Sequence, residues 1–258
     1  PFALACLRVA GQVAESGANG LRFRGDEAGA VLREVIGHDR PLAEASLAAL
    51  DARTEGWAAG LQLAALSLRD HPDVDRFITS FSGSHRFVLD YLTEEVLERQ
   101  SPDMRSFLLQ PSVLERLSGE LCDAVTGRVD GQAMLEAIER ANLFLVPLDE
   151  VRGWWRYHHL FADLLRVRLS QELPDKLEEL HRNAADWHEK HGLADDAVRH
   201  ALAAGDAPRA ARLVEYHADG CIQGGREATL RRWIAALPAE LVASRPRLLL
   251  ARSLVALL

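Results

Sequence analysis

The stretch that decides the fold is residues 143–165, LFLVPLDEVRGWWRYHHLFADLL. Its first part, LFLVPLD, alternates apolar side chains with the period of a strand, which places Phe144, Val146 and Leu148 on one face. WWRYH follows after a polar turn that contains a glycine, and LFADLLRVRL then shows helical periodicity. The pattern predicts a β-hairpin that leads directly into a helix.

Three helices are predicted upstream of this hairpin, at about residues 102–110, 118–127 and 130–142. The start at Ser101-Pro102-Asp103 is a strong one. It combines a capping hydroxyl, a proline in the first turn and an acid near the positive end of the helix. Three helices, a hairpin and a further helix are the components of a winged-helix domain, which we assign to residues 84–172.

Helical periodicity also dominates the rest of the chain, so the predicted fold class is mostly α. Residues 23–83 are predicted to form a small helical domain, with helices at about 25–37, 42–53, 56–68 and 74–81. Residues 173–258 are predicted to begin a solenoid of the tetratricopeptide kind, because paired helices are separated by short Gly/Pro breaks. Its helices are expected at about 175–191, 194–204, 206–219, 226–236 and 246–258.

Composition excludes several classes of protein. The chain has 258 residues and a formal net charge of −8, which disfavours direct binding to nucleic acid, because such binding needs cations to neutralise phosphates. Its apolar runs are far shorter than the roughly 20 residues of a membrane span. The odd number of widely spaced cysteines, Cys6, Cys122 and Cys221, predicts neither disulfides nor a zinc site and indicates the cytoplasm.

A phosphate-binding P-loop is also absent from the sequence. The lysines are Lys176 and Lys190, and neither belongs to a Gly-Lys-Ser/Thr motif. Because the chain begins at Pro1 and ends in ARSLVALL, we expect it to be an internal segment of a longer protein.

Two adjacent histidines, His158 and His159, lie between the hairpin and its helix. They could serve in packing, or donate a hydrogen bond to a phosphate at a helix start. A metal site is disfavoured, because His159 and Asp163 supply only two ligands at helical spacing. Hydrolysis is disfavoured, because spacing nominates no nucleophile or orienting acid. No catalytic residue is predicted, and HEKH at 188–191 lacks the zinc-protease spacing.

Several strings together resemble the MalT-type large ATP-binding LuxR-family transcriptional regulators, within the class of signal-transducing NTPases. The resemblance runs in order along essentially the whole chain and is densest from 54 to 205. The strings that carry it are TEGWAAGLQLAALSL (54–68), FSGSHRFVLDYLTEEVL (81–97), FLLQPSVLERLSGELCDAVTG (107–127), ERANLFLVPLDE (139–150), WWRYHHLFADLLRVRL (154–169) and ELHRNAADWHEKHGLADDAVRHALAAGD (179–206).

The resemblance implies a nucleotide-binding domain, a small helical domain, a winged helix, a helical-repeat sensor and a helix-turn-helix domain in the whole protein. Residues 1–22 would then be the tail of the nucleotide-binding domain, while the P-loop and helix-turn-helix domains lie outside this chain. ATP or ADP would bind to the full-length protein rather than to this segment. The implied partners are the nucleotide-binding domain of the same protein, a small-molecule or protein inducer at the repeats, and further copies on activation. We expect no direct DNA binding and no membrane contact.

The resemblance also nominates site residues. YHHL matches a Met-His-Asp-like motif whose histidine contacts the β-phosphate of ADP, so His158 takes that role, while Tyr157 and His159 depart from the motif. GLQLA (60–64) resembles a Gly-Leu-Pro-Leu-Ala element that packs near the adenine, with Gln62 in place of the proline. Gly60, Leu61 and Trp57 are therefore candidate nucleotide contacts, with core packing as the alternative for Trp57 and Leu61.

The expected function is a non-catalytic, signal-transducing segment of an ATP-dependent transcriptional activator. A phosphate contact from His158 would favour a closed, ADP-bound state, and inducer binding would favour an open one. The alternatives are a nucleic-acid-binding winged helix and part of an NTP hydrolase whose P-loop lies elsewhere. The nucleic-acid-binding alternative is disfavoured, because the predicted helix at 130–142 has only one cation, Arg140.

Overall fold

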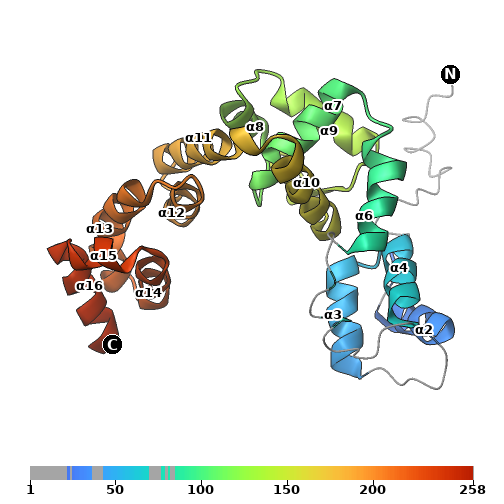
Figure 1. The fold of residues 1–258 in the computed structure, drawn as a ribbon, viewed down its shortest axis with the longest axis horizontal. Helices are drawn as coiled ribbons and strands as arrows, with labels where there is room; N and C mark the ends of the chain where they lie inside the picture. Colours follow the sequence, from blue (N-terminus) through green and yellow to red (C-terminus); the bar gives the residue numbers. More distant parts are fainter. Residues whose placement is uncertain are drawn as a thin grey trace. The chain divides into compact units, whose positions relative to one another are not determined.

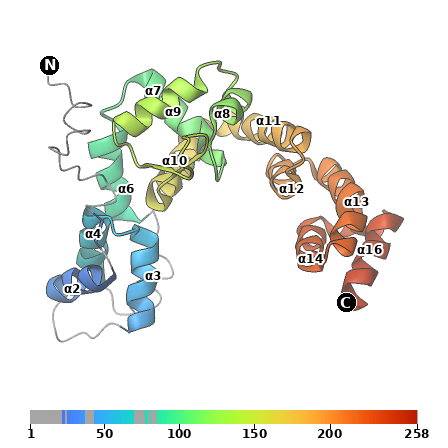
Figure 2. The ribbon, with the colours of Figure 1, turned by 180° about the vertical axis from the view of Figure 1, so that it is seen from behind.

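The computed structural model describes residues 22–23, 25–36, 43–69, 77–78, 81 and 85–257. The chain divides into two compact units between Leu92 and Thr93. Figures 1 and 2 label the helices from both sides. The expected tail at 1–21 and most of the predicted helix at 74–81 lie outside the described residues.

The first unit confirms the predicted small helical bundle. Its helices are α2 (Gly25–Ile36), α3 (Glu44–Thr54), α4 (Ala58–Arg69) and α6 (Arg86–Leu92). The helices α2, α3 and α4 pack against one another, and α6 packs on α4. The apolar face predicted for α4 is the buried one, since its apolar residues are 0% exposed: Leu61, Ala64, Ala65 and Leu68.

A helix begins at Arg86, but its hydrogen-bonding pattern changes from α to π where the second unit begins. α6 continues as the π-helical turn η2 (Thr93–Leu97), in which the Glu98 amide donates to the Thr93 carbonyl at 2.9 Å. Thr93 is buried, and Arg168 Nη2 donates to its hydroxyl at 3.0 Å. Tyr91, in the last turn of α6, is 39% exposed.

A winged helix occupies the start of the second unit, as the hairpin pattern predicts. Its elements are α7 (Pro102–Leu109), η3 (Gln110–Val113), α8 (Gly119–Thr126), α9 (Gly131–Arg140), β1 (Leu145–Pro147), β2 (Trp155–Tyr157) and α10 (His159–Glu172). Ser101 caps α7 by accepting from the Met104 amide at 3.2 Å. Ser118 caps α8 by accepting from the Leu121 amide at 3.3 Å.

The hairpin is short, and the three side chains predicted to share one face are not buried alike. β1 and β2 pair antiparallel with Pro147 opposite Trp155, and Leu117 bridges the other side of Trp155. Trp155 is 0% exposed and anchors the hairpin, whereas Leu148 is 44% exposed, and Phe144 and Val146 are half-buried. Phe144 adopts a left-handed backbone conformation (φ 54°), which ends the predicted alternation before β1 begins.

Helical repeats complete the second unit. After η4 (Pro174–Lys176) come α11 (Leu177–Lys190), α12 (Ala194–Ala203), α13 (Ala207–Gln223), α14 (Glu227–Ala236), α15 (Ala239–Ala243) and α16 (Pro246–Leu257). Successive helices pack as neighbours from α11 to α14, and the short α15 is an element that the periodicity does not predict. The mostly helical fold class is confirmed. That the repeats are tetratricopeptide-like stays a prediction.

Candidate functional site

His158 lies at the start of α10, where its backbone is fixed on both sides. Its amide donates to the Phe144 carbonyl at 2.8 Å, and its carbonyl accepts from the Ala162 amide at 2.9 Å. The imidazole is 3% exposed and meets the Phe144 ring edge-on, with the centroids 5.9 Å apart. This burial favours the packing alternative, and a phosphate contact, which stays a prediction, would require the ring to become accessible.

The other three candidate residues lie in the first unit. Leu61 is 0% exposed and belongs to the core of the bundle, which favours its packing alternative. A Cβ at Gly60 would lie 2.5 Å from the Trp57 indole, so the absent side chain is what lets the indole lie against α4. The half-buried Trp57 ring is 5.8 Å from that of Tyr91. Nucleotide binding by Trp57 and Gly60 stays a prediction.

Within the described ranges, no group of three or more His, Cys, Asp or Glu side chains could hold a metal ion. No helix among the same residues is long and apolar enough to span a bilayer.

A site that sequence reasoning missed is the junction between the winged helix and the first helical pair of the repeats. We use the word junction for Arg116, Glu120, Val125 and Trp154 on one side, and Asn183, Trp187, His191 and Asp196 on the other. α8 packs against α11, and Figures 1 and 2 both show these helices side by side.

Aromatic rings form the centre of the junction. Trp154, from the hairpin turn, meets Trp187 of α11 edge-on, with centroids 6.3 Å apart. On its other side, Trp187 stacks on His191 at 3.8 Å. The Arg116 guanidinium lies 5.4 Å from the centroid of the Trp154 ring, within reach of a cation–π interaction. Of the two adjacent tryptophans, Trp155 is thus a core residue, while Trp154 joins two elements.

Polar contacts surround these rings. Asn183 Nδ2 donates to the Val125 carbonyl, the last turn of α8, at 3.2 Å. His191 Nε2 lies 3.3 Å from Glu120, and Arg116 lies 3.8 Å from Asp196. Because both aromatic and polar groups cross the junction, the winged helix and the first repeat are held in one arrangement.

Three histidines lie directly behind the junction, between α11 and α12. The Nδ1 atoms of His181 and His200 are 2.8 Å apart, so one ring donates its proton to the other. His188 stacks on His200 with ring centroids 5.2 Å apart, and its Nε2 is 3.9 Å from Asp196. Burial, followed by the nearby Arg199, lowers the pKa of His200 to about 2. All three rings are therefore mainly neutral at pH 7, since burial also lowers the pKa of His181 and of His188 from the ordinary 6.5.

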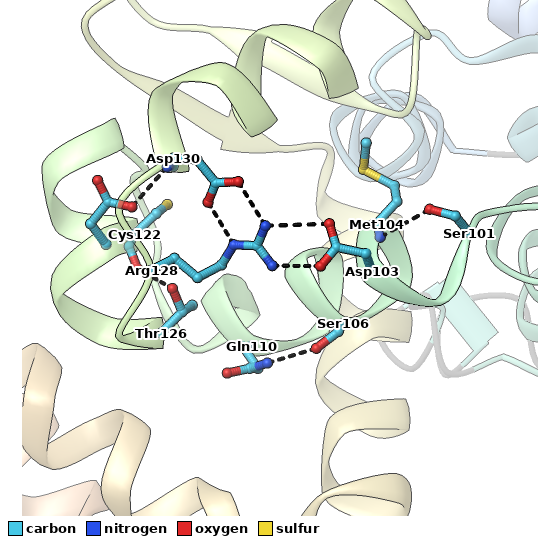
Figure 3. A network of polar contacts seen from close by, with 11 residues as sticks. Ser101, Asp103, Met104, Ser106, Gln110, Cys122, Thr126, Arg128 and Asp130 are labelled. Carbon is cyan, nitrogen blue, oxygen red and sulfur yellow. Dashed lines mark hydrogen bonds and ion pairs between the residues drawn. The ribbon is translucent and has the colours of Figure 1, made fainter.

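Arg128 lies just after the C-terminal end of α8 and links neighbouring helices. Figure 3 shows its guanidinium between two carboxylates, with Asp103 of α7 at 2.6 Å and Asp130 at 2.7 Å. These hydrogen bonds raise the pKa of Arg128 above its ordinary value. Asp130, which precedes α9, bonds Arg128 instead of capping its own helix, and Asp123 Oδ1 accepts from the Gly131 amide at 2.7 Å. The network ties α7, α8 and α9 together around one cation.

Comparison with known proteins agrees with this architecture. Residues 93–177 match the family described as the MalT winged helix domain. The chain is 41% identical, over 245 residues, to the serine/threonine-protein kinase PknK of Mycobacterium tuberculosis, in strains CDC 1551 and H37Rv. The PknK of Mycobacterium bovis is similar at the same identity. Each match covers 95% of this chain.

The matched family begins at residue 93, where the second unit also begins, whereas the prediction began the winged-helix domain at 84. The family match supports a MalT-type relationship for the winged helix, a domain that suggests a regulatory segment. The chain spans 22% of the length of the curated relatives it matches.

Proposed function

We propose that this chain is the regulatory segment of an ATP-dependent LuxR-family transcriptional activator, coupling nucleotide state to inducer sensing without catalysis of its own. The junction is the observation that supports it best. A ligand that moves α11 would act directly on the winged helix, because Trp154 packs on Trp187 and Asn183 bonds α8. Closely packed interfaces transmit such displacements, since they do not deform continuously.

The partners follow from that role. ATP or ADP would be held by a nucleotide-binding domain of the same protein, and the winged helix would contact it in the closed state. An inducer, a small molecule or a protein, would bind the repeats, and opening would expose surfaces for self-association. This scheme operates in the cytoplasm.

Matched histidine variants test the nucleotide coupling. In the longer protein that carries this chain, His158→Ala should weaken ADP binding by about 10-fold, the loss expected for one charge-assisted hydrogen bond. The neighbouring, exposed His159 gives the control, His159→Ala, which should leave ADP affinity unchanged. Unchanged ADP affinity in both variants, together with a loss of stability in His158→Ala alone, would assign His158 to packing.

A second candidate function is regulation of a protein kinase. It is favoured by the 41% identity to PknK, which extends over 95% of this chain. Two assays on the longer protein separate the candidates. Transfer of labelled phosphate from ATP to a serine or threonine substrate supports the kinase, whereas inducer-dependent, sequence-specific promoter binding supports the transcriptional activator.

Direct DNA binding by the winged helix is the weaker alternative. α9 exposes Gln132, Glu136 and Arg140, and Arg140 Nε donates to the Glu136 carbonyl at 3.2 Å. Such a helix presents one cation and one acid to a phosphate backbone. A salt-sensitive gel shift of duplex DNA by this chain alone would favour this alternative.

A further inference from the structure

A charged hollow of about 820 Å³ lies in the repeats, between α11 and α13. Its volume is within the range of small-molecule sites. Its lining is made mainly of cations and carboxylates, in place of the apolar walls of a core cavity. It is lined by Asp186, Glu189 and Lys190 from α11, by Asp206 just before α13, by Pro208, Arg209 and Arg212 from α13, and by Arg245 from the turn before α16.

Arg209 forms the floor of the hollow. Its side chain is 13% exposed and is clamped by the two carboxylates of α11. Its Nε and Nη2 donate to Glu189 Oε2 at 3.1 and 2.6 Å, and its Nη1 donates to Asp186. A guanidinium has five N–H groups, so two remain for a ligand. The clamp fixes the direction in which they point.

The rim has more donors than acceptors. Glu189 already serves Arg209, and its other oxygen accepts from Arg212 Nη1 at 3.0 Å. Arg212 is 61% exposed and keeps four further N–H groups. Arg245 uses one N–H on Glu215 at 2.9 Å. Lys190 is exposed and forms no ion pair with any residue that the structure describes. Asp206 accepts from the Arg209 amide at 3.0 Å, so each of the three carboxylates in the lining already has a partner, while the cations retain unused donors.

We propose that this hollow binds a small polyanion, a polycarboxylate or a phosphorylated metabolite, which bridges Lys190 and Arg212 above the Arg209 floor. Guanidinium groups match the oxygen geometry of carboxylates and phosphates, and an ammonium adds a mobile donor. Polycarboxylates and phosphorylated metabolites share this chemistry, so both classes suit the hollow. The spacing of the ligand's oxygen atoms decides which class binds.

The bound anion would tie α11 to α13. α11 also carries Trp187, and His191 directly follows its last residue, so the ligand would act on the same helix that forms the junction. This inference rests on the proposed function, because it gives the inducer expected at the repeats a chemical class and a place.

Calorimetric titration of the 258-residue chain tests the proposal, with citrate and pyrophosphate as separate anionic probes and sorbitol as an uncharged one. Saturable, one-site binding is expected for at least one anion, weakening as NaCl is raised, and none is expected for sorbitol. Lys190→Glu and Arg212→Gln should each reduce the affinity by about 10-fold or more.

Lys176→Glu is the matched control, since it makes the same change at the other lysine, an exposed residue outside the hollow. It should alter affinity by less than about 2-fold, because exposed charges beyond a Debye length are screened. Citrate binding alone would identify a carboxylate site, and pyrophosphate binding alone a phosphate site.

Absence of saturable binding by both anions would overturn the proposal, as would equal losses in Lys176→Glu and Lys190→Glu. Neither result bears on the proposed function, which is tested separately by ADP affinity in the paired histidine variants. Lys190 is exposed, so Lys190→Glu should keep the thermal midpoint of the parent chain, and its result stands even where Arg212→Gln unfolds.

Discussion

Acidification should destabilise the first helical pair of the repeats, because His200 cannot accept a proton where it lies. The ring is 0% exposed, and its Nδ1 is shared with His181. Its Nε2 is buried and has no hydrogen-bond partner among the described residues. A charged His200 would therefore bury an unpaired N–H, close to the Arg199 guanidinium that already disfavours it.

The direction and size of the change in stability follow from the difference between the folded and the unfolded pKa of His200. An unfolded histidine takes up its proton near pH 6.5, whereas burial lowers the pKa of folded His200 to about 2. The stability that the neutral ring contributes is complete above pH 6.5 and is lost as the pH falls toward 2. Between pH 7.5 and 5.5 the free energy of unfolding should fall by roughly 1–2 kcal/mol on account of His200 alone.

Urea unfolding at pH 7.5, 6.5 and 5.5, followed by tryptophan fluorescence, measures this fall. His200→Leu removes the titrating group, so its stability should depend less steeply on pH than that of the parent chain. His181 and His188 remain in the variant, and because both contact His200, the difference between the two slopes reports the loss of His200 together with its effect on these two rings. Equal slopes for His200→Leu and the parent would refute the reasoning.

Further predictions concern the packing of the second unit. Gly131→Ala should destabilise the winged helix, because its Cβ would lie 2.6 Å from a backbone carbonyl oxygen of α8. Gly220→Ala, in α13 with nothing within 4 Å of the new Cβ, should instead raise the free energy of unfolding by about 0.5–1 kcal/mol. Trp155→Ala should cost about 3–5 kcal/mol in the same urea assay, since the side chain is 0% exposed. Cys122 and Cys221 should resist thiol labelling in the native chain, as peptide mass spectrometry would detect, because burial raises the pKa of both thiols.

Periodicity predicted most helices within a few residues, because each presents one apolar face over two turns or more. α8 began where Ser118 predicted, since a capping hydroxyl is a local signal. The five-residue α15 is too short to display a period, and the π-helical turn after Leu92 continues the apolar pattern unchanged. Both were therefore missed.

The functional residues were predicted less well, because they depend on contacts between distant segments. Trp154 and Trp187 belong to different motifs in the sequence, and only the packing of α8 on α11 brings them together. The burial of His158 depends on Phe144, whose left-handed backbone turns the chain before β1. In the sequence, the charged residues of the hollow look like those of ordinary solvated helix faces. Only the fold, which brings α13 beside α11, shows that they line one hollow.

Pro147 affects the tendency of this protein to associate through its hairpin edge at high concentration. Trp155 directs its amide and carbonyl to Leu117, so the backbone nitrogen of Pro147, opposite Trp155, faces the outer edge of the hairpin. That nitrogen carries no hydrogen, and the edge therefore lacks a donor where another strand would attach. A neighbouring chain cannot extend the hairpin into an intermolecular sheet there, which guards the wing against fibril-like polymerisation.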